Sequence, residues 1–142
     1  MEWLNIPDNV EECFGFIYRI ERINAKEGER KYYLGKKQFW SNVKLKPLKG
    51  KTKSRRVRKS SDWKSYYGSS NELKADLALH GKENFKREIL EITSCKWESA
   101  YVELMWQLKE NAILRYDYYN SIINIRLNGP PKHLVEKYTS RL

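Results

Sequence analysis

Two segments near the start of the chain, residues 14–23 and 31–36, are predicted to form the paired strands of a β-hairpin. In the first segment every second residue is large and apolar, and these residues are Phe14, Phe16, Tyr18 and Ile20. A period of two places them on one face of a strand. Residues 24–30, which include Gly28 and several charges, are typical of an exposed turn into the second strand. Pairing of the two strands brings Tyr18 close to Tyr33.

The segment after this hairpin carries almost all of the net charge of the chain. Residues 36–59 hold eleven basic residues and no acid, and these are Lys36, Lys37, Lys44, Lys46, Lys49, Lys51, Lys53, Arg55, Arg56, Arg58 and Lys59. Because the whole chain has 28 basic and 18 acidic residues, the rest has a net charge of −1 and the total of +10 comes from this segment. Pro47 and Gly50 interrupt any period, so the pattern favours a long basic loop.

A run of charge is often only a solvated loop or a localisation signal. Here no acid compensates the charge, and Phe39 and Trp40 lie within it, which favours binding to the phosphates of a nucleic acid. We therefore predict DNA as the partner. The residues predicted to contact it are Lys36, Lys37, Lys49, Lys51, Lys53, Arg55, Arg56, Arg58 and Lys59.

Length and composition indicate one folded domain of 142 residues, with a basic insertion at about 36–59 and a C-terminal extension at about 125–142. A hydrophobic content of 40% argues against general disorder. Cys13 and Cys95 lie far apart, so we expect buried free thiols rather than a disulfide or a zinc site. The chain contains no apolar run long enough to span a bilayer and no signal-peptide pattern, so we expect a soluble, cytosolic protein.

Further elements follow from capping and periodicity. Residues 62–67 predict a short helix that Gly68 ends, and the capping box Ser69-x-x-Glu72 predicts a helix that ends at Gly81. Residues 84–92 predict a third strand. A longer helix, capped by Ser94 and running from 95 to about 116, would bury a stripe formed by Trp97, Tyr101, Leu104, Leu108 and Ala112. Glu103 lies beside that stripe, and a last helix is expected after Gly129-Pro130-Pro131.

The order of these motifs resembles the GIY-YIG nucleases, especially phage homing-endonuclease-like members. The residues that carry the resemblance are Phe16-Ile17-Tyr18, Tyr33-Leu34-Gly35, Leu79-His80-Gly81 with Phe85, and Glu103 with Trp106. It covers about residues 14–124. The resemblance implies an α+β fold in which a small three-stranded antiparallel sheet is flanked by helices. It also implies a DNA endonuclease that hydrolyses phosphodiester bonds with one divalent metal ion, Mg²⁺ or another such as Mn²⁺.

The resemblance also implies roles for single residues. Glu103 matches the metal-binding glutamate, Tyr18 and Tyr33 match the paired active-site tyrosines, and Asn120 loosely matches a downstream polar residue. An arginine after the hairpin would contact the scissile phosphate. The candidates are Arg55, Arg56 and Arg58, with Arg55 favoured by its distance from residues 68–70. The chain departs from the family where Phe16 replaces the first glycine of the motif and where a long insertion follows Gly35.

These residue types suit phosphodiester hydrolysis independently of the family. One carboxylate and several waters make an ordinary magnesium site, and a cationic fork stabilises charge on the phosphate oxygens. A tyrosine has a pKa of about 10, so we expect nearby cations to lower it if the phenol acts as a base. Which tyrosine accepts the proton is open at this stage.

Plainer interpretations exist for each residue. Tyr18 and Tyr33 would serve as cross-strand packing partners, Glu103 as a solvated helix residue, and His80 as the end of a helix. The alternative function is a non-catalytic nucleic-acid-binding module that uses the same basic segment. A third possibility is an interaction protein whose basic segment binds an acidic protein. The joint pattern of the two tyrosines and Glu103 favours the nuclease.

Overall fold

A four-stranded sheet forms the centre of the protein, whose structure is a computed structural model that describes residues 2–142. The strand order is β1-β6-β2-β3, with β1 at Trp3–Leu4, β2 at Gly15–Arg22, β3 at Tyr32–Gln38 and β6 at Phe85–Thr93. Strand β2 pairs antiparallel with both β3 and β6, whereas β1 pairs parallel with β6. The α+β class is confirmed. The prediction of three strands was wrong by one, because the two-residue strand β1 is too short to show a period.

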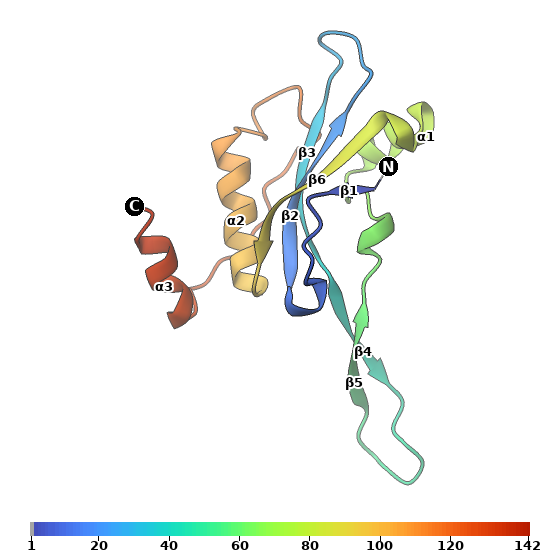
Figure 1. The fold of residues 1–142 in the computed structure, drawn as a ribbon, viewed down its shortest axis with the longest axis vertical. Coiled ribbons are helices and arrows are strands. Elements are labelled where there is room, and N and C mark those ends of the chain that lie inside the picture. Colours follow the sequence, from blue (N-terminus) through green and yellow to red (C-terminus); the bar gives the residue numbers. More distant parts are fainter. Residues whose placement is uncertain (1) are drawn as a thin grey trace.

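Helices cover both faces of this sheet (Figure 1). Helix α1 (Asn71–His80) and the 3₁₀ turn η2 (Trp63–Ser65) lie on the face that buries Phe16, Tyr18 and Ile20. Helices α2 (Lys96–Lys109) and α3 (Lys132–Thr139) lie on the opposite face, where Ile17 contacts Val102. Strand alternation therefore divides the apolar residues of β2 between two cores. Short 3₁₀ turns at Val10–Glu12 and Lys82–Asn84 complete the ordered elements.

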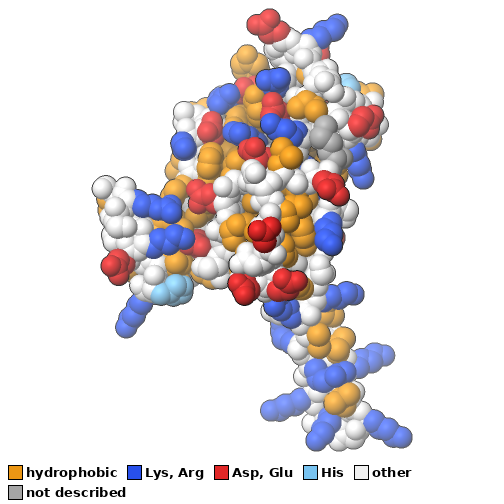
Figure 2. All heavy atoms as spheres, in the orientation of Figure 1, with side chains coloured by type: hydrophobic (Ala, Val, Ile, Leu, Met, Phe, Trp, Pro, Cys, Tyr) orange, Lys and Arg blue, Asp and Glu red, His pale blue; other side chains and the backbone are white. Residues whose placement is uncertain are grey.

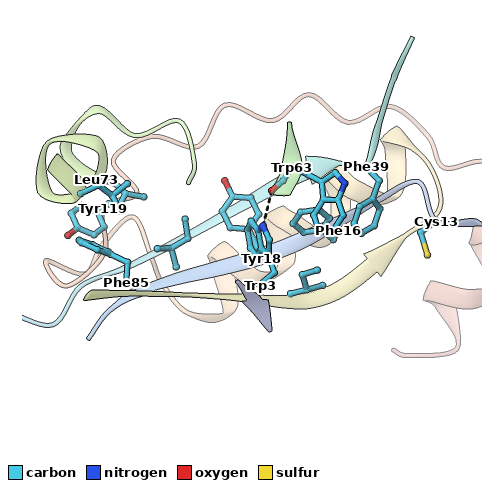
Figure 3. Packing of buried hydrophobic residues seen from close by; sticks show 12 residues of the cluster. Trp3, Cys13, Phe16, Tyr18, Phe39, Trp63, Leu73, Phe85 and Tyr119 are labelled. Atoms are coloured by element: carbon cyan, nitrogen blue, oxygen red, sulfur yellow. Dashed lines mark hydrogen bonds between the residues drawn. The ribbon is translucent and has the colours of Figure 1, made fainter. Parts of the chain in front are cut away.

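The larger core is rich in aromatic rings (Figure 3). Trp3, Phe39 and Trp63 surround Phe16, with ring centroids 4.7–6.2 Å from it. The indole N–H of Trp3 donates a hydrogen bond of 2.8 Å to the carbonyl oxygen of Trp63. Because buried indoles need a hydrogen-bond partner, this bond ties the N-terminal strand to η2 across 60 residues of sequence. It also holds in place the segment that follows η2 and borders the site described below.

The basic segment is a second, two-stranded sheet and not the long loop that its sequence predicts. Strands β4 (Trp40–Leu45) and β5 (Arg55–Ser60) pair antiparallel from Trp40↔Ser60 to Leu45↔Arg55. Pro47 and Gly50, which suggested a loop, are confined to the turn at residues 46–54. The cross-strand pair Val43↔Val57 supplies the β-branched contact that favours strand pairing. Figure 1 shows this hairpin projecting away from the rest of the molecule.

Several helix boundaries differ from those predicted. Helix α1 starts one residue later than the capping box implies, because the Ser70 hydroxyl, and not that of Ser69, accepts from the Leu73 N–H. Cys95 rather than Ser94 caps α2. Helix α2 ends at Lys109 instead of continuing to Tyr116, since Asn111 takes a left-handed φ of 51°. The end of α1 at Gly81 and the final helix after the prolines are confirmed.

The buried face of α2 also differs from the predicted stripe. Leu108 is 57% exposed, whereas Val102 and Gln107 are buried. Trp106 packs with Leu34 and Ala112 and donates to the Glu91 carboxylate at 3.2 Å. The helix is therefore rotated so that the side carrying Glu103 faces β3.

Cys13 is buried and Cys95 is half-buried, and both are free thiols. The pKa of Cys13 is raised, first by burial and then by the charge of Glu12. Over residues 2–142, the structure holds no helix with the length and apolar character needed to cross a membrane.

Helix α3 is held on α2 by the buried carboxylate of Glu98. Its Oε2 accepts from Lys137 Nζ and from the Tyr138 hydroxyl, both at 2.7 Å, and its Oε1 accepts from the Ser94 N–H at 2.8 Å. Burial raises the pKa of Glu98, but these hydrogen bonds outweigh it and hold the pKa below its usual value. A buried carboxylate with several donors is stable, while the loss of one donor is costly.

Replacing Tyr138 with phenylalanine is expected to lower the free energy of unfolding by about 1.5–3 kcal/mol, because a charged buried acceptor loses a donor. Urea denaturation, monitored by tryptophan fluorescence, measures this loss of stability. The depressed pKa of Glu98 makes its contribution present above pH ~4.3 and lost as the pH falls through the folded-state pKa. The difference in the free energy of unfolding between the Tyr138→Phe variant and the wild type should therefore become smaller at acid pH. Tyr116→Phe, at an 84% exposed position, is the matched control and should leave the free energy of unfolding unchanged. Equal stability of the two variants would contradict the role of Glu98.

Candidate active site

A cavity of about 470 Å³ opens at the free edge of β3, between the two layers of helices. Its walls come from β2, β3, α2, the segment before α1 and the chain that follows α2. The lining residues most relevant to chemistry are Tyr18, Tyr33, Lys36, Tyr66, Ser69 and Glu103. The structure thus brings together both predicted tyrosines and the predicted glutamate.

Tyr18 reaches this cavity because its neighbour on β3 is a glycine. Tyr18 pairs with Gly35, and a Cβ placed on Gly35 would lie only 2.6 Å from Cζ of Tyr18. The phenol can cross over β3 toward its free edge only where no side chain stands. A register shift between β2 and β6 occurs at Ile17/Tyr18, and such bulges commonly redirect a side chain at a functional site.

Tyr33 lies beside Tyr18, with ring centroids 6.1 Å apart, as the hairpin register predicted. Its hydroxyl shares a hydrogen bond of 3.0 Å with Oγ of Ser69. Gly68, at φ +89°, allows this approach, since a Cβ there would lie 2.9 Å from Cε1 of Tyr33. Tyr33 is half-buried, whereas Tyr18 is 1% exposed. The more accessible phenol is therefore that of Tyr33.

A third tyrosine, Tyr66, lines the same cavity and was missed by the sequence analysis. Its ring meets that of Tyr18 edge-on, at 6.1 Å and 89°. Arg87, buried on β6, donates from Nη1 to the carbonyl oxygens of Lys64 and Tyr66, at 3.0 and 2.9 Å. These bonds fix the backbone that carries Tyr66. Nothing in the local sequence marked this position, because Arg87 lies 21 residues further along the chain.

Glu103 projects from α2 toward the same cavity. Burial raises the pKa of its carboxyl, while the charge of Lys36 and a hydrogen bond to the Lys36 backbone act in the opposite direction. Lys36 and Glu103 both line the cavity. Glu103 is thus a half-buried carboxylate next to a single lysine, and not the solvated helix residue of the plainer interpretation.

The pKa values of the two catalytic candidates are raised, not lowered as we expected. For Tyr18 the causes are burial first, then Tyr33, Tyr66 and the charge of Glu103. For Tyr33 burial is again the largest cause, partly offset by the hydrogen bond from Ser69. The charges on β4 and β5 do not reverse this, because no residue of these two strands is among the described lining residues of the cavity. Both phenols keep their proton at neutral pH in this state.

The residues at the cavity fit a magnesium ion. Glu103 is a hard carboxylate ligand, and the hydroxyls of Ser69 and Ser70 and the amide of Asn124 are further oxygen donors among the lining residues. Within residues 2–142, no cluster of three or more His, Cys, Asp or Glu residues is suited to a closed metal site. One carboxylate with open positions is what Mg²⁺ accepts, because it keeps several waters and binds phosphate oxygens.

The three candidate arginines lie outside the described lining of this cavity. Arg55 and Arg56 are exposed on β5. Arg58 stacks on Trp40, with Cζ 3.8 Å from the ring centroid, and donates to the Glu11 carbonyl oxygen at 2.7 Å. The cation that lines the cavity is Lys36. The nearby Lys37 forms an ion pair of 2.6 Å with Asp62 and lies over the ring of Tyr66.

Asn120 lines the cavity but has its amide engaged elsewhere. It accepts from the Leu34 N–H at 3.0 Å and donates to the Leu34 carbonyl oxygen at 2.8 Å. Tyr32 and Tyr118 form an adjacent parallel bridge. Asn120 therefore fastens the chain after α2 along the free edge of β3.

A second cavity, of about 710 Å³, adjoins the first and shares Lys36 and Tyr66 with it. Its cations are Lys36, Lys37, Lys96 and Arg126, and its aromatic walls include Trp40 and Trp97. No acidic residue is among its described lining residues. Lys96 and Arg126 were absent from the predicted DNA contacts, since they lie outside the basic segment.

The chain matches the family described as "Putative endonuclease segE, GIY-YIG domain" over residues 3–123. It belongs to the GIY-YIG nuclease family. The match spans both tyrosines, the two-stranded ribbon formed by β4 and β5, and Glu103. It ends before α3. Neither the curated proteins nor the solved structures include a significant match. Membership shows an endonuclease domain, the domain of a phosphodiester hydrolase that acts on DNA.

Proposed function

We propose that this GIY-YIG protein is a metal-dependent endonuclease that nicks or cuts duplex DNA, as its resemblance to homing-endonuclease-like members implies. The observation that supports this most is the placement of Tyr18, Tyr33 and Glu103 around one cavity at an open sheet edge. These residues come from three different elements. A purely structural role would not require Gly35 to clear a path for a buried phenol.

In the proposed reaction Glu103 holds Mg²⁺, or another divalent cation such as Mn²⁺. When bound, that cation stabilises charge on the phosphate oxygens and lowers the pKa of a bound water. Tyr33, whose hydroxyl is accessible and fixed by Ser69, orients the attacking water. Tyr18 packs beside Tyr33, with ring centroids 6.1 Å apart, and helps to hold that ring in place. Lys36 supplies positive charge beside the phosphate, a position for which we expected an arginine.

A specific observation also favours the alternative, a non-catalytic nucleic-acid-binding module. Within the described lining of the cavity there is no arginine, although a phosphate-cleaving site usually has a cation that forms a fork. A protein that only binds DNA would keep the second cavity and the basic strands but would have no use for Glu103. The two functions differ in one measurable property, which is cleavage.

Supercoiled plasmid incubated with the protein and magnesium should be converted to relaxed or linear DNA, and chelator should prevent this. Tyr33→Phe should lower the rate by about 10²–10⁴-fold, because the water loses its positioning hydroxyl. A gel time course measures both. Tyr32→Phe is the matched control, since Tyr32 lies on the same strand but packs against Tyr118 on the other face.

Plasmid that is retarded but never cut, with every divalent cation tried, would move the assignment to the binding module. Equal rates for Tyr33→Phe and Tyr32→Phe would remove Tyr33 from the reaction while leaving the nuclease in place.

A further inference from the structure

The ribbon formed by β4 and β5 meets the rest of the protein at its root, where Trp40 packs against the larger core and Arg58 donates to the Glu11 carbonyl oxygen. All six residues of β5 are exposed, and β4 contains no buried residue. Figure 2 shows Lys and Arg side chains around the projecting ribbon, and no acidic residue occurs in residues 36–59. A two-stranded ribbon without a buried side chain gains little to offset the conformational entropy lost on ordering it, which points to a partner. Its charge calls for a polyanion.

The two faces of the ribbon carry different chemistry. The two residues of each cross-strand pair point to the same face of the ribbon. Successive pairs along the strands point to opposite faces. One face carries the pairs Trp40↔Ser60, Asn42↔Arg58 and Lys44↔Arg56. The other is centred on Val43↔Val57. The valine pair holds the register, and the first face presents hydrogen-bonding groups.

The groups on this polar face are available to a partner. Over residues 2–142, no hydrogen bond or ion pair from another side chain occupies Asn42, Lys44 or Arg56. Arg58 is engaged at the root of the ribbon, where it stacks on Trp40. An asparagine amide pairs with adenine and an arginine fork with guanine at the base edges in the major groove. A surface that only follows phosphates would gain nothing from the uncharged Asn42.

The dimensions agree with insertion into a groove. The major groove is about 12 Å wide and admits a two-stranded ribbon, whereas the minor groove, about 6 Å wide, does not. Six residues of strand extend about 20 Å, which corresponds to roughly six base pairs. The root of the ribbon also adjoins the site, because Trp40 and Ser41 line the second cavity, which shares Lys36 with the first. A duplex cut at the first cavity would continue along the ribbon on one side only.

We propose that the β4–β5 ribbon enters the major groove of duplex DNA beside the cut, with Asn42, Lys44 and Arg56 facing the base edges. This inference rests on the proposed DNA-cleaving function for the position of the cut, but the binding it describes needs no cleavage. It makes the ribbon a sequence-reading element as well as a source of charge. Sequence preference then resides in residues that are distant from the catalytic cavity.

The test uses Glu103→Gln protein in chelator, so that DNA stays intact, and measures binding to duplexes by fluorescence anisotropy. Methyl green, which occupies the major groove, should displace the protein, whereas netropsin in the minor groove should not. Selection from a randomised duplex should yield a preference on one side of the site. Arg56→Ala should weaken binding to the selected duplex about 5- to 150-fold and relax the preference.

Matched variants distinguish recognition of the base sequence from the effect of positive charge on binding. Asn42→Ala should change the preference without changing the salt dependence, because it removes no charge. Lys49→Ala, in the turn, should weaken binding to all sequences alike and reduce the salt slope by about 0.9. Displacement by netropsin alone, or by neither competitor, would overturn the inference. If plasmid is never cut but groove dependence holds, the proposed cleavage fails and the ribbon assignment stands.

Discussion

Replacing Glu103 with glutamine is expected to abolish plasmid cleavage, with a rate loss of about 10³-fold or more. The variant keeps the size of the side chain but loses the only charged oxygen ligand among the described lining residues of the cavity. A cation that stabilises phosphate charge contributes several kcal/mol, and each 1.36 kcal/mol is a factor of ten in rate. DNA affinity should stay equal or rise, because one negative charge near the phosphate is removed.

The same residue sets an expected pH dependence. Burial raises the pKa of Glu103, and Lys36 only partly offsets this. The protonated, metal-free form of the carboxyl therefore persists to higher pH than in an unperturbed glutamate, whose pKa is about 4.3. Cleavage by the wild type should fall on acidification at a pH above that value, and rising magnesium should shift the fall to lower pH.

Glu110→Gln is the matched control for both measurements. Glu110 caps the same helix, forms an ion pair of 3.6 Å with Arg115, and is absent from the described lining of the cavity. It should cut plasmid at the wild-type rate. Cleavage that survives in Glu103→Gln under the same conditions would place the metal elsewhere and refute the assigned site.

Neutralising the ribbon is expected to have the second largest effect, a loss of DNA affinity of about 10³–10⁴-fold at 0.1 M salt. The change replaces Lys49, Lys51, Lys53, Arg55 and Arg56 with glutamine and leaves Arg58, which stacks on Trp40, in place. For the wild type, contact with about five to eight phosphates predicts a slope of log affinity against log salt of roughly −4 to −7. The variant should flatten this slope by up to about 4.5.

The loss should appear in binding and not in the chemical step. Since none of the five side chains lines the cavity, cleavage at saturating DNA should keep its rate while the half-saturating concentration rises. A control variant removes the same number of charges from exposed positions elsewhere, at Lys26, Arg30, Lys74, Lys82 and Lys109. If the two variants bind alike, the ribbon contributes only net charge and its proposed contact with DNA is wrong.

Much of the site could be predicted because its parts are local. The alternation in residues 14–23 is sufficient to predict strand β2, and pairing with β3 then brings Tyr18 to Gly35 and Tyr33. Glycine at 81 and the prolines at 130–131 correctly predicted where helices end or begin. These features depend on backbone sterics and hydrogen bonds within a few residues, which the sequence specifies directly.

The errors arose where the outcome depended on distant contacts. The ribbon was mistaken for a loop because β5 is mostly charged and shows no apolar alternation, and because the supporting contact between Val43 and Val57 forms only when the two strands pair. The end of α2 was misplaced because Ile113 and Leu114 look helical, although both are exposed. Tyr66 was missed because Arg87, on β6, positions it.

The sequence by itself therefore determined the hairpin, the tyrosine pair, the helical glutamate and the concentration of positive charge between residues 36 and 59. These features depend on the local periodicity and composition of the chain. Only the tertiary structure decided which side of α2 faces the sheet, which cation lines the cavity and where the arginines project. Those choices depend on packing between elements that lie far apart in the chain. Periodicity can show that a face is apolar, but not which surface buries it.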